Sequence, residues 1–328
     1  MMKTELLRLL IDRMEHQEYL SGQEISGHLQ CSRTAIWKHI NQLKEAGFEI
    51  ESIRNRGYRL IQEPDQISPH GIAARLKKDS MFQYVIHKET TSSTQDDAME
   101  LIQSGAAQGT VVISDTQSKG RGRLGREWHS ASDGGLWFSM IVKPDIPVYR
   151  APQLTLVTGV ALVRVLNQLL DEPGTFRIKW PNDILADRLK TAGILTEMHA
   201  DPDRVKALMI GVGINVNQTT FPKSLEGRAE SIAGLTGKPM KRSIVLSLFL
   251  TEFEYWYQLF LKEGFQSIKT VWEANALPTG QVVSMNTGKS IIKGKTSGIT
   301  DDGVMQLIDD HGEVHELYSA NLDWKEIP

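Results

Sequence analysis

The stretch that organises this chain is GRGRLGREW, residues Gly120 to Trp128. Three glycines alternate with three arginines, and a tryptophan ends the run. Glycine lets a ligand approach the backbone closely, and successive N–H groups in such a loop form an anion-binding concavity. Arginine adds a planar fork of donors suited to phosphate or carboxylate. The run predicts a loop that closes on a small anion, although a solvated basic loop or a nucleic-acid contact fits the same composition.

Length and composition set the broad limits. The chain has 328 residues, 40% hydrophobic and 23% charged, which predicts two or three globular domains. The formal net charge of −3 excludes a global basic field, so any contact with DNA must come from a local patch. A single cysteine, Cys31, allows no internal disulfide and favours a cytoplasmic location. The early charges near the N-terminus argue against a signal peptide, and we expect no membrane span.

Residues 1–62 predict a winged helix-turn-helix domain. A leucine-rich amphipathic helix comes first, and a second helix follows the capping-box pattern of Ser21 and Glu24. Ser32 is the expected N-cap of a third helix that ends at Gly47. Two alternating strands around a basic turn then form a β-hairpin, the wing.

The third helix and the wing supply the expected DNA contacts. In this motif the N-terminal part of the recognition helix faces the major groove, and the wing meets the backbone or the minor groove. Cys31 is expected to be a small buried residue. A protein-interaction domain remains the alternative, and Trp37 fits a core position under the wing as well. The predicted DNA-binding residues are Ser32, Arg33, Thr34, Trp37, Lys38, Arg54 and Arg56, with His39 beside them.

The remaining chain divides into a linker and two further domains. Residues 63–69 are polar and hold two prolines, which predicts a linker. Residues 70–272 alternate strands and helices and predict a mixed α/β domain, with glycines inside the strand 208–217 that indicate a close approach. Residues 275–328 contain short strands between Gly/Asp turns and predict a small β-barrel. The expected fold class is α+β multidomain.

Four ordered motifs resemble those of biotin–protein ligases. They are the Gly120–Trp128 run, Lys-Trp-Pro-Asn-Asp at 179–183, Lys-x-x-Gly-Ile-Leu at 190–195 and Gly-x-Gly-Ile-Asn at 211–215. With a winged helix in front, the chain resembles the bifunctional bacterial form, which is also the biotin-operon repressor. The resemblance covers essentially the whole chain and implies an SH3-like C-terminal barrel.

The resemblance implies a two-step activity. Biotin and ATP give biotinyl-5′-AMP and pyrophosphate, and biotin then passes to a lysine of the biotin carboxyl carrier protein of acetyl-CoA carboxylase. Two anions, a carboxylate and an α-phosphate, must be brought together, and the charge that develops must be stabilised. The mixed anhydride must also be shielded from water, which a mobile cationic loop can do.

The resemblance also assigns residues. Lys190 and Arg123 are the expected catalytic cations, although a solvated strand-end lysine fits position 190 too. Asp183 matches the side of the site that faces the triphosphate and would help to hold Mg²⁺, but a structural Asn-Asp turn explains it as well. Ser92 stands where the family often has Asp. The expected biotin-binding residues are Ser93, Thr94, Gln95, Gln117, Arg121, Gly122, Arg123 and Lys190, and the nucleotide-binding residues are Lys179, Asn182 and Asn215.

The resemblance further implies regulation. Biotinyl-AMP acts as corepressor, so that the liganded chain forms a homodimer and binds operator DNA at genes of biotin synthesis or transport. Two alternatives remain at this point. One is a metabolite-sensing transcription factor without ligase activity, against which the intact Lys190 and Arg123 argue. The other is a lipoyl or related acyl-protein ligase, against which the loop and the Lys-Trp-Pro-Asn-Asp motif argue.

Overall fold

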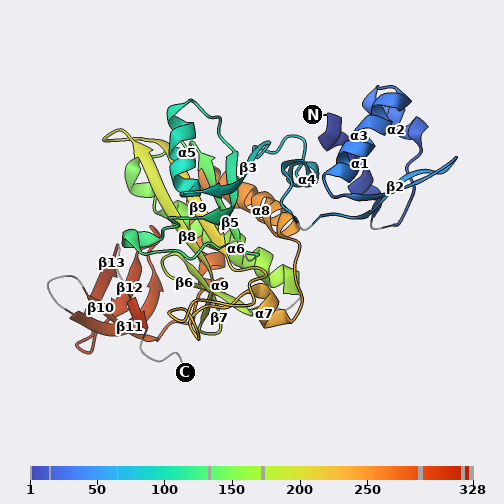
Figure 1. Cartoon of the computed structure of the whole chain (residues 1–328). Helices are drawn as coiled ribbons and strands as arrows, with labels where there is room; N and C mark the ends of the chain where they lie inside the picture. The colour runs from blue at the N-terminus through green and yellow to red at the C-terminus, as the bar shows by residue number, and fades with distance from the viewer. Residues whose placement is uncertain are drawn as a thin grey trace.

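The computed structural model describes residues 2–14, 16–64, 66–131, 134–170, 174–286, 291–318 and 322–324. Figure 1 shows a small helical unit near the N-terminus, a larger α/β body and a strand-rich unit near the C-terminus. These are the three kinds of unit that the sequence predicts, and the α+β fold class is confirmed.

The N-terminal unit is a winged helix. Its elements are α1 (Met2–Met14), α2 (Gly22–Leu29), α3 (Arg33–Glu45), β1 (Glu49–Ile53) and β2 (Gly57–Gln62). Both halves of the capping box between Ser21 and Glu24 are present, and Ser32 Oγ accepts a hydrogen bond from Ala35 N at 3.2 Å. Each such cap stabilises a helix by about 1 kcal/mol. Leucine and isoleucine side chains of the three helices form one buried core against the wing.

Helix α4 (Pro69–Arg75) joins the winged helix to the body. Arg8 of α1 donates hydrogen bonds to the backbone oxygens of Ala73, Ala74 and Leu76, at 2.9 to 3.1 Å. Arg75 pairs with the buried carboxylate of Glu63. The segment after the wing is therefore packed and hydrogen-bonded at both ends in the part that the structure describes.

A seven-stranded mixed sheet forms the body, in the order β3-β4-β5-β9-β8-β7-β6. Among the neighbouring strands of this sheet, β3 and β4 pair in parallel and the others pair antiparallel. Strands β8 and β9 lie side by side with Gly193 opposite Gly213. The strands are β3 (Tyr84–Thr91), β4 (Thr110–Gln117), β5 (Leu136–Val142), β6 (Phe176–Lys179), β7 (Asp183–Ala186), β8 (Leu189–Ala200) and β9 (Val205–Ile214).

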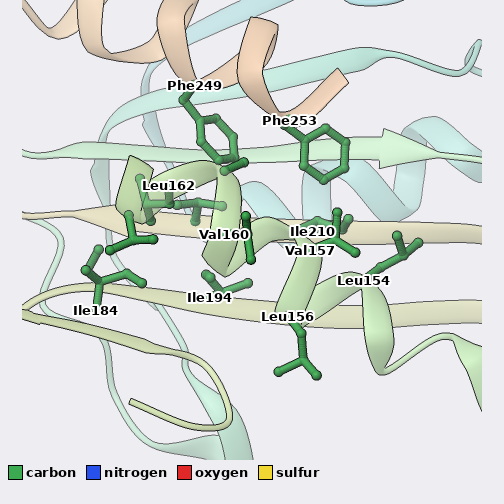
Figure 2. Packing of buried hydrophobic residues seen from close by; sticks show 14 of the residues in the cluster. Leu154, Leu156, Val157, Val160, Leu162, Ile184, Ile194, Ile210, Phe249 and Phe253 are labelled. Atoms are coloured by element: carbon green, nitrogen blue, oxygen red, sulfur yellow. The ribbon is translucent and has the colours of Figure 1, made fainter. Parts of the chain in front are cut away.

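Helices cover both faces of this sheet. Helix α5 (Thr94–Gln103) packs on β4, β5 and β9 through a small apolar cluster. On the other face, α6 (Gln153–Leu170) packs on β6, β7 and β8 and against α8 (Arg242–Glu263), whose Phe249 packs on Phe138 of β5 with ring centroids 5.4 Å apart. Figure 2 shows aliphatic side chains of α6 together with Ile194 and Ile210 of the sheet and Phe249 and Phe253 of α8, which all belong to one buried cluster. The remaining short elements of the body are α7 (Ile232–Thr236), α9 (Gln266–Asn275), η1 (Arg123–Gly125) and η2 (Val148–Arg150).

The segment Val148–Leu170, which contains α6, is long and apolar enough to cross a membrane by length and composition. Of its most apolar part, 67% is buried inside the protein. A core helix of this kind needs no membrane, because the sheet and α8 already cover its apolar side chains.

The C-terminal unit is a five-stranded antiparallel sheet in the order β13-β12-β11-β10-β14. It contacts the body where Trp180 Nε1 donates to Gly303 O at 3.2 Å and Gln153 Nε2 donates to Asp302 O at 3.3 Å. The strands are β10 (Val282–Asn286), β11 (Ile291–Ile299), β12 (Met305–Ile308), β13 (Val314–Leu317) and β14 (Leu322–Trp324).

Candidate active site

The glycine–arginine loop, residues Gly120 to Trp128, lies between β4 and β5 and closes on itself. Trp128 N donates to Gly120 O at 2.9 Å, and Gly122 N donates to Arg126 O at 2.7 Å. At the tip, Leu124 is 72% exposed and has a φ of 59°. The loop is therefore a small hairpin whose tip is open to solvent and whose base is hydrogen-bonded.

Trp128 anchors this loop on the sheet. A Cβ on Gly213 would lie 2.4 Å from the Trp128 ring, and a Cβ on Gly193 would lie 2.9 Å from it. The two strand glycines thus leave room for the indole, and this is the close approach that glycines inside a strand predict. Trp137 packs edge-on against the Trp128 indole, with 6.1 Å between the ring centroids. Lys190 Nζ lies 5.0 Å from the Trp128 ring centroid.

The hydroxyl-rich turn at the start of α5 lies beside the loop. Ser93 is the N-cap of α5. Gln117 Oε1 accepts from Thr94 N at 2.8 Å and from Thr94 Oγ1 at 3.1 Å, while Gln117 Nε2 donates to Ser130 Oγ at 2.8 Å. Ser93 and Thr94 are both buried. The polar groups of this turn are therefore held in fixed positions before any ligand arrives.

The predicted cations Lys190 and Arg123 both contact residues at the short turn between β6 and β7. Lys190 Nζ pairs with Asp183 Oδ1 at 2.7 Å. Arg123 Nη1 donates to Asn182 Oδ1 at 3.2 Å, and Asn182 Nδ2 donates to Ile194 O at 2.8 Å. Burial lowers the pKa of the Arg123 guanidinium, although Asp183 acts in the opposite direction. A guanidinium stays charged in proteins, so Arg123 presents a poorly hydrated positive charge to the site.

One cavity of about 200 Å³ brings the predicted residues together. Glycines of β8 and β9 line its floor, together with Phe138 and Trp180. Of the predicted residues, its walls contain Ser93, Thr94, Gln95, Gln117, Arg121, Gly122, Arg123, Lys179, Asn182, Asp183 and Lys190.

Asn215 lies outside this cavity. It lines an adjoining hollow with Phe221 and Arg228, and the two hollows share Lys179, Asp183 and Lys190 as walls. Both polar atoms of its side-chain amide are hydrogen-bonded within the protein. Asn215 Nδ2 donates to Lys190 O at 3.1 Å, and Asn215 Oδ1 accepts from Gln218 Nε2 at 3.0 Å.

Sequence reasoning missed two acidic residues that bind side chains of the cavity wall. Arg121 Nη1 donates to Asp96 Oδ1 at 2.6 Å, and Arg121 Nη2 donates to Glu197 Oε2 at 3.0 Å. Gln95 Nε2 donates to the same Glu197 oxygen at 3.0 Å. No local motif marks either acid, since they come from α5 and β8.

The predicted DNA-binding residues lie in the winged helix, apart from the cavity. Trp37 is 59% exposed, so its core alternative is wrong. Arg54 is exposed in the β1–β2 turn, whereas Arg56 stacks on Tyr19 with 4.5 Å between its guanidinium carbon and the ring centroid. Five of the predicted residues form an exposed surface at the start of α3: Ser32, Arg33, Thr34, Trp37 and Lys38.

Comparisons with known proteins agree with this arrangement. Residues 87–217 match the Biotin/lipoate A/B protein ligase family, and residues 5–59 match a helix-turn-helix domain. The biotin protein ligase of Aquifex aeolicus in complex with biotin and ATP superposes with a TM-score of 0.65 at 31% identity, covering 74% of this chain and all of that one. The class is thus a ligase fold of the biotin/lipoate type that carries a DNA-binding domain.

Relatives over the full length narrow the class. The bifunctional ligase/repressor BirA of Bacillus subtilis is 42% identical over 328 residues, covering 98% of this chain and 99% of the relative. The Escherichia coli protein of the same name is 28% identical and covers 92% of each chain. The chain belongs to the family of bifunctional biotin–protein ligases and repressors.

Proposed function

We propose that this protein activates biotin with ATP to biotinyl-5′-AMP and transfers it to a lysine of the biotin carboxyl carrier protein of acetyl-CoA carboxylase. The observation that carries this proposal is the convergence of the loop, the hydroxyl-rich turn and Lys190 on one cavity. The relatives named as ligases, and the Aquifex aeolicus structure with biotin and ATP, support the same reaction.

Lys190 and Arg123 are the proposed catalytic residues. Both cations line the cavity, where they would offset the repulsion between the biotin carboxylate and the α-phosphate. Ion pairing with Asp183 keeps Lys190 near the junction of the two hollows. When ATP binds, its phosphates would compete for this lysine, so that the charge is available where the anhydride forms.

The proposed binding residues divide between the two hollows. The ring of biotin would lie by Ser93, Thr94, Gln95 and Gln117, with Arg121 and Gly122 above it. The nucleotide would extend along Lys179 and Asn182 toward the hollow of Asn215 and Phe221.

A divalent cation fits the nucleotide side. Mg²⁺ favours one or two carboxylates together with substrate phosphates, and Asp183 offers one carboxylate at the junction of the hollows. Asp183 would hold Mg²⁺ there, and the ion would neutralise charge on the phosphates.

The second proposed function is repression from the cytoplasm. The exposed start of α3 and Arg54 would contact operator DNA, and biotinyl-AMP would favour a homodimer that presents two winged helices to two half-sites. Sedimentation and gel-shift titrations with biotinyl-AMP test this. Tighter dimerisation and operator binding are expected, and no change in either would contradict the proposal.

ATP-dependent labelling of the carrier domain with radiolabelled biotin tests the ligase proposal. The wild type is expected to label the carrier, Lys190→Ala to lose labelling, and Lys206→Ala, at an exposed lysine paired with Asp201, to retain it. Competition between biotin and lipoate in pyrophosphate release separates the two acyl substrates. Absent labelling by the wild type, or preference for lipoate, would contradict the proposal.

A further inference from the structure

We propose that Glu197 and Asp96 are positioning residues that hold the glycine–arginine loop closed through Arg121. The two carboxylates come from different elements, Asp96 from the first turn of α5 and Glu197 from β8. They accept from the two terminal nitrogens of one guanidinium, at 2.6 and 3.0 Å. Only the effect of these residues on retention of biotinyl-AMP rests on the proposed ligase function, since the contacts themselves exist without a ligand.

The loop is thereby fastened at both ends. At the C-terminal end of the loop, the Trp128 ring packs on Gly193 and Gly213. At its N-terminal end, Arg121 forms ion pairs with Asp96 and Glu197. We call the ion pairs of Arg121 with Asp96 and Glu197 the latch. The side chains of Arg121, Asp96 and Glu197 are 31%, 46% and 36% exposed, respectively. Contacts that are this exposed can open, because water competes for them, whereas the seat of the indole is apolar.

The pKa of Arg121 is shifted in the direction that these two ion pairs predict. The pKa of the Arg121 guanidinium is raised, because the hydrogen bonds to Glu197 and Asp96 outweigh the largest single effect, burial, which lowers it. Both terminal nitrogens of Arg121 are used on carboxylates, so its side chain serves the latch, and a contact between this residue and biotin would use its backbone.

Glu197 also contacts a residue that lines the cavity, Gln95. Its Oε2 accepts from Gln95 Nε2 at 3.0 Å, and the same nitrogen lies 3.2 Å from Leu195 O. Gln95 follows Ser93 and Thr94 in the hydroxyl-rich turn. Because Gln95 also lines the cavity, a ligand that binds Gln95 would also restrict Glu197 and the loop above it. Occupancy of the cavity and closure of the loop become coupled through this one carboxylate.

Limited trypsin digestion of the ligand-free chain tests the latch without any assumption about function. Glu197→Gln keeps the shape and an acceptor for Gln95 but removes the charge. Cleavage after Arg123 and Arg126 is expected to become about two- to fivefold faster, the factor expected for a partly exposed ion pair. Asp201→Asn, which removes an exposed ion pair at the turn between β8 and β9, is the matched control and leaves the rate unchanged.

Asp96→Asn provides a second, independent opening of the latch. It is expected to accelerate loop cleavage by a similar factor, while cleavage elsewhere and the melting temperature stay at their wild-type values. Wild-type cleavage rates for both variants would overturn the proposal. A uniform rise at all sites would overturn it too, because it would show general destabilisation instead of loop opening.

The rate at which the enzyme loses bound biotinyl-AMP measures the functional effect of the latch. Enzyme loaded with labelled biotin and ATP is separated from free ligand, and loss of biotinyl-AMP is followed over time. Glu197→Gln is expected to lose it about two- to fivefold faster and to raise the KM for biotin, with kcat for carrier labelling within about twofold. A wild type that never labels the carrier would refute the proposed function. A labelling-competent Glu197→Gln with wild-type retention would refute the latch.

Discussion

Replacing Gly213 with alanine tests the seat of the loop most sharply. The new Cβ would lie 2.4 Å from Trp128 Cε2 and 2.5 Å from Trp128 Nε1, well inside contact distance. The backbone of β9 cannot yield easily, because Gly213 is paired with Trp137 of β5 on one side and with Gly193 of β8 on the other. The indole must therefore leave its place, and the loop must move with it.

The size of the effect follows from the cost of overpacking. Forcing an extra methyl group into a filled space costs about 1–3 kcal/mol. If the closed loop is required for tight binding, biotin affinity should fall by about 5-fold to about 150-fold, since 1.4 kcal/mol corresponds to about tenfold. Isothermal titration with biotin measures this, and tryptophan fluorescence reports displacement of Trp128.

Gly27→Ala in α2 is the matched control for Gly213→Ala. A Cβ at this position meets nothing within 4 Å, so biotin affinity should be unchanged. If Gly213→Ala bound biotin as tightly as the wild type, with an unchanged tryptophan spectrum, Trp128 would not be the anchor of the loop, and the argument would be refuted.

Three further predictions concern other parts of the chain. Lys38→Ala should weaken binding to every operator sequence and leave carrier labelling intact. The slope of log affinity against log salt concentration should fall in magnitude by about one, which gel shifts at several salt concentrations measure. Trp37 should lose fluorescence when operator binds, because it is exposed in the free protein, and Trp37→Phe should abolish that change. Burial tends to raise the pKa of Asp115, but pairing with His87 and Arg242 lowers it overall. This carboxylate should therefore stabilise the fold above its ordinary pKa and lose that contribution as pH falls through the lowered value. Urea unfolding from about pH 5 to about pH 2 should show a weaker acid dependence in Asp115→Asn.

Local rules account for what the sequence predicts well. The caps at Ser21 and Ser32 depend on side chains within three residues, so the starts of α2 and α3 could be predicted. The strand glycines predict a close approach for a similar reason, because a missing side chain is visible in the sequence. What approaches them, Trp128, follows from strand pairing and loop geometry, which only the structure reveals.

Long-range pairing explains what the sequence could not predict. Asp96 and Glu197 meet Arg121 only after α5 and β8 have packed around the cavity. Trp37 was ambiguous because one position along the helix, a rotation of about 100°, separates it from the buried Ile36. Asn215 was predicted from its motif as a nucleotide contact, and the structure adds that its amide also holds the backbone of Lys190.

The structure of this chain with biotinyl-AMP bound tests most directly whether the glycine–arginine loop covers the intermediate. The anhydride is expected to lie under the glycine–arginine loop, with Lys190 Nζ within hydrogen-bond distance of its carboxyl or phosphate oxygens. A ligand bound elsewhere, or a loop that points into solvent while the cavity is occupied, would contradict this expectation.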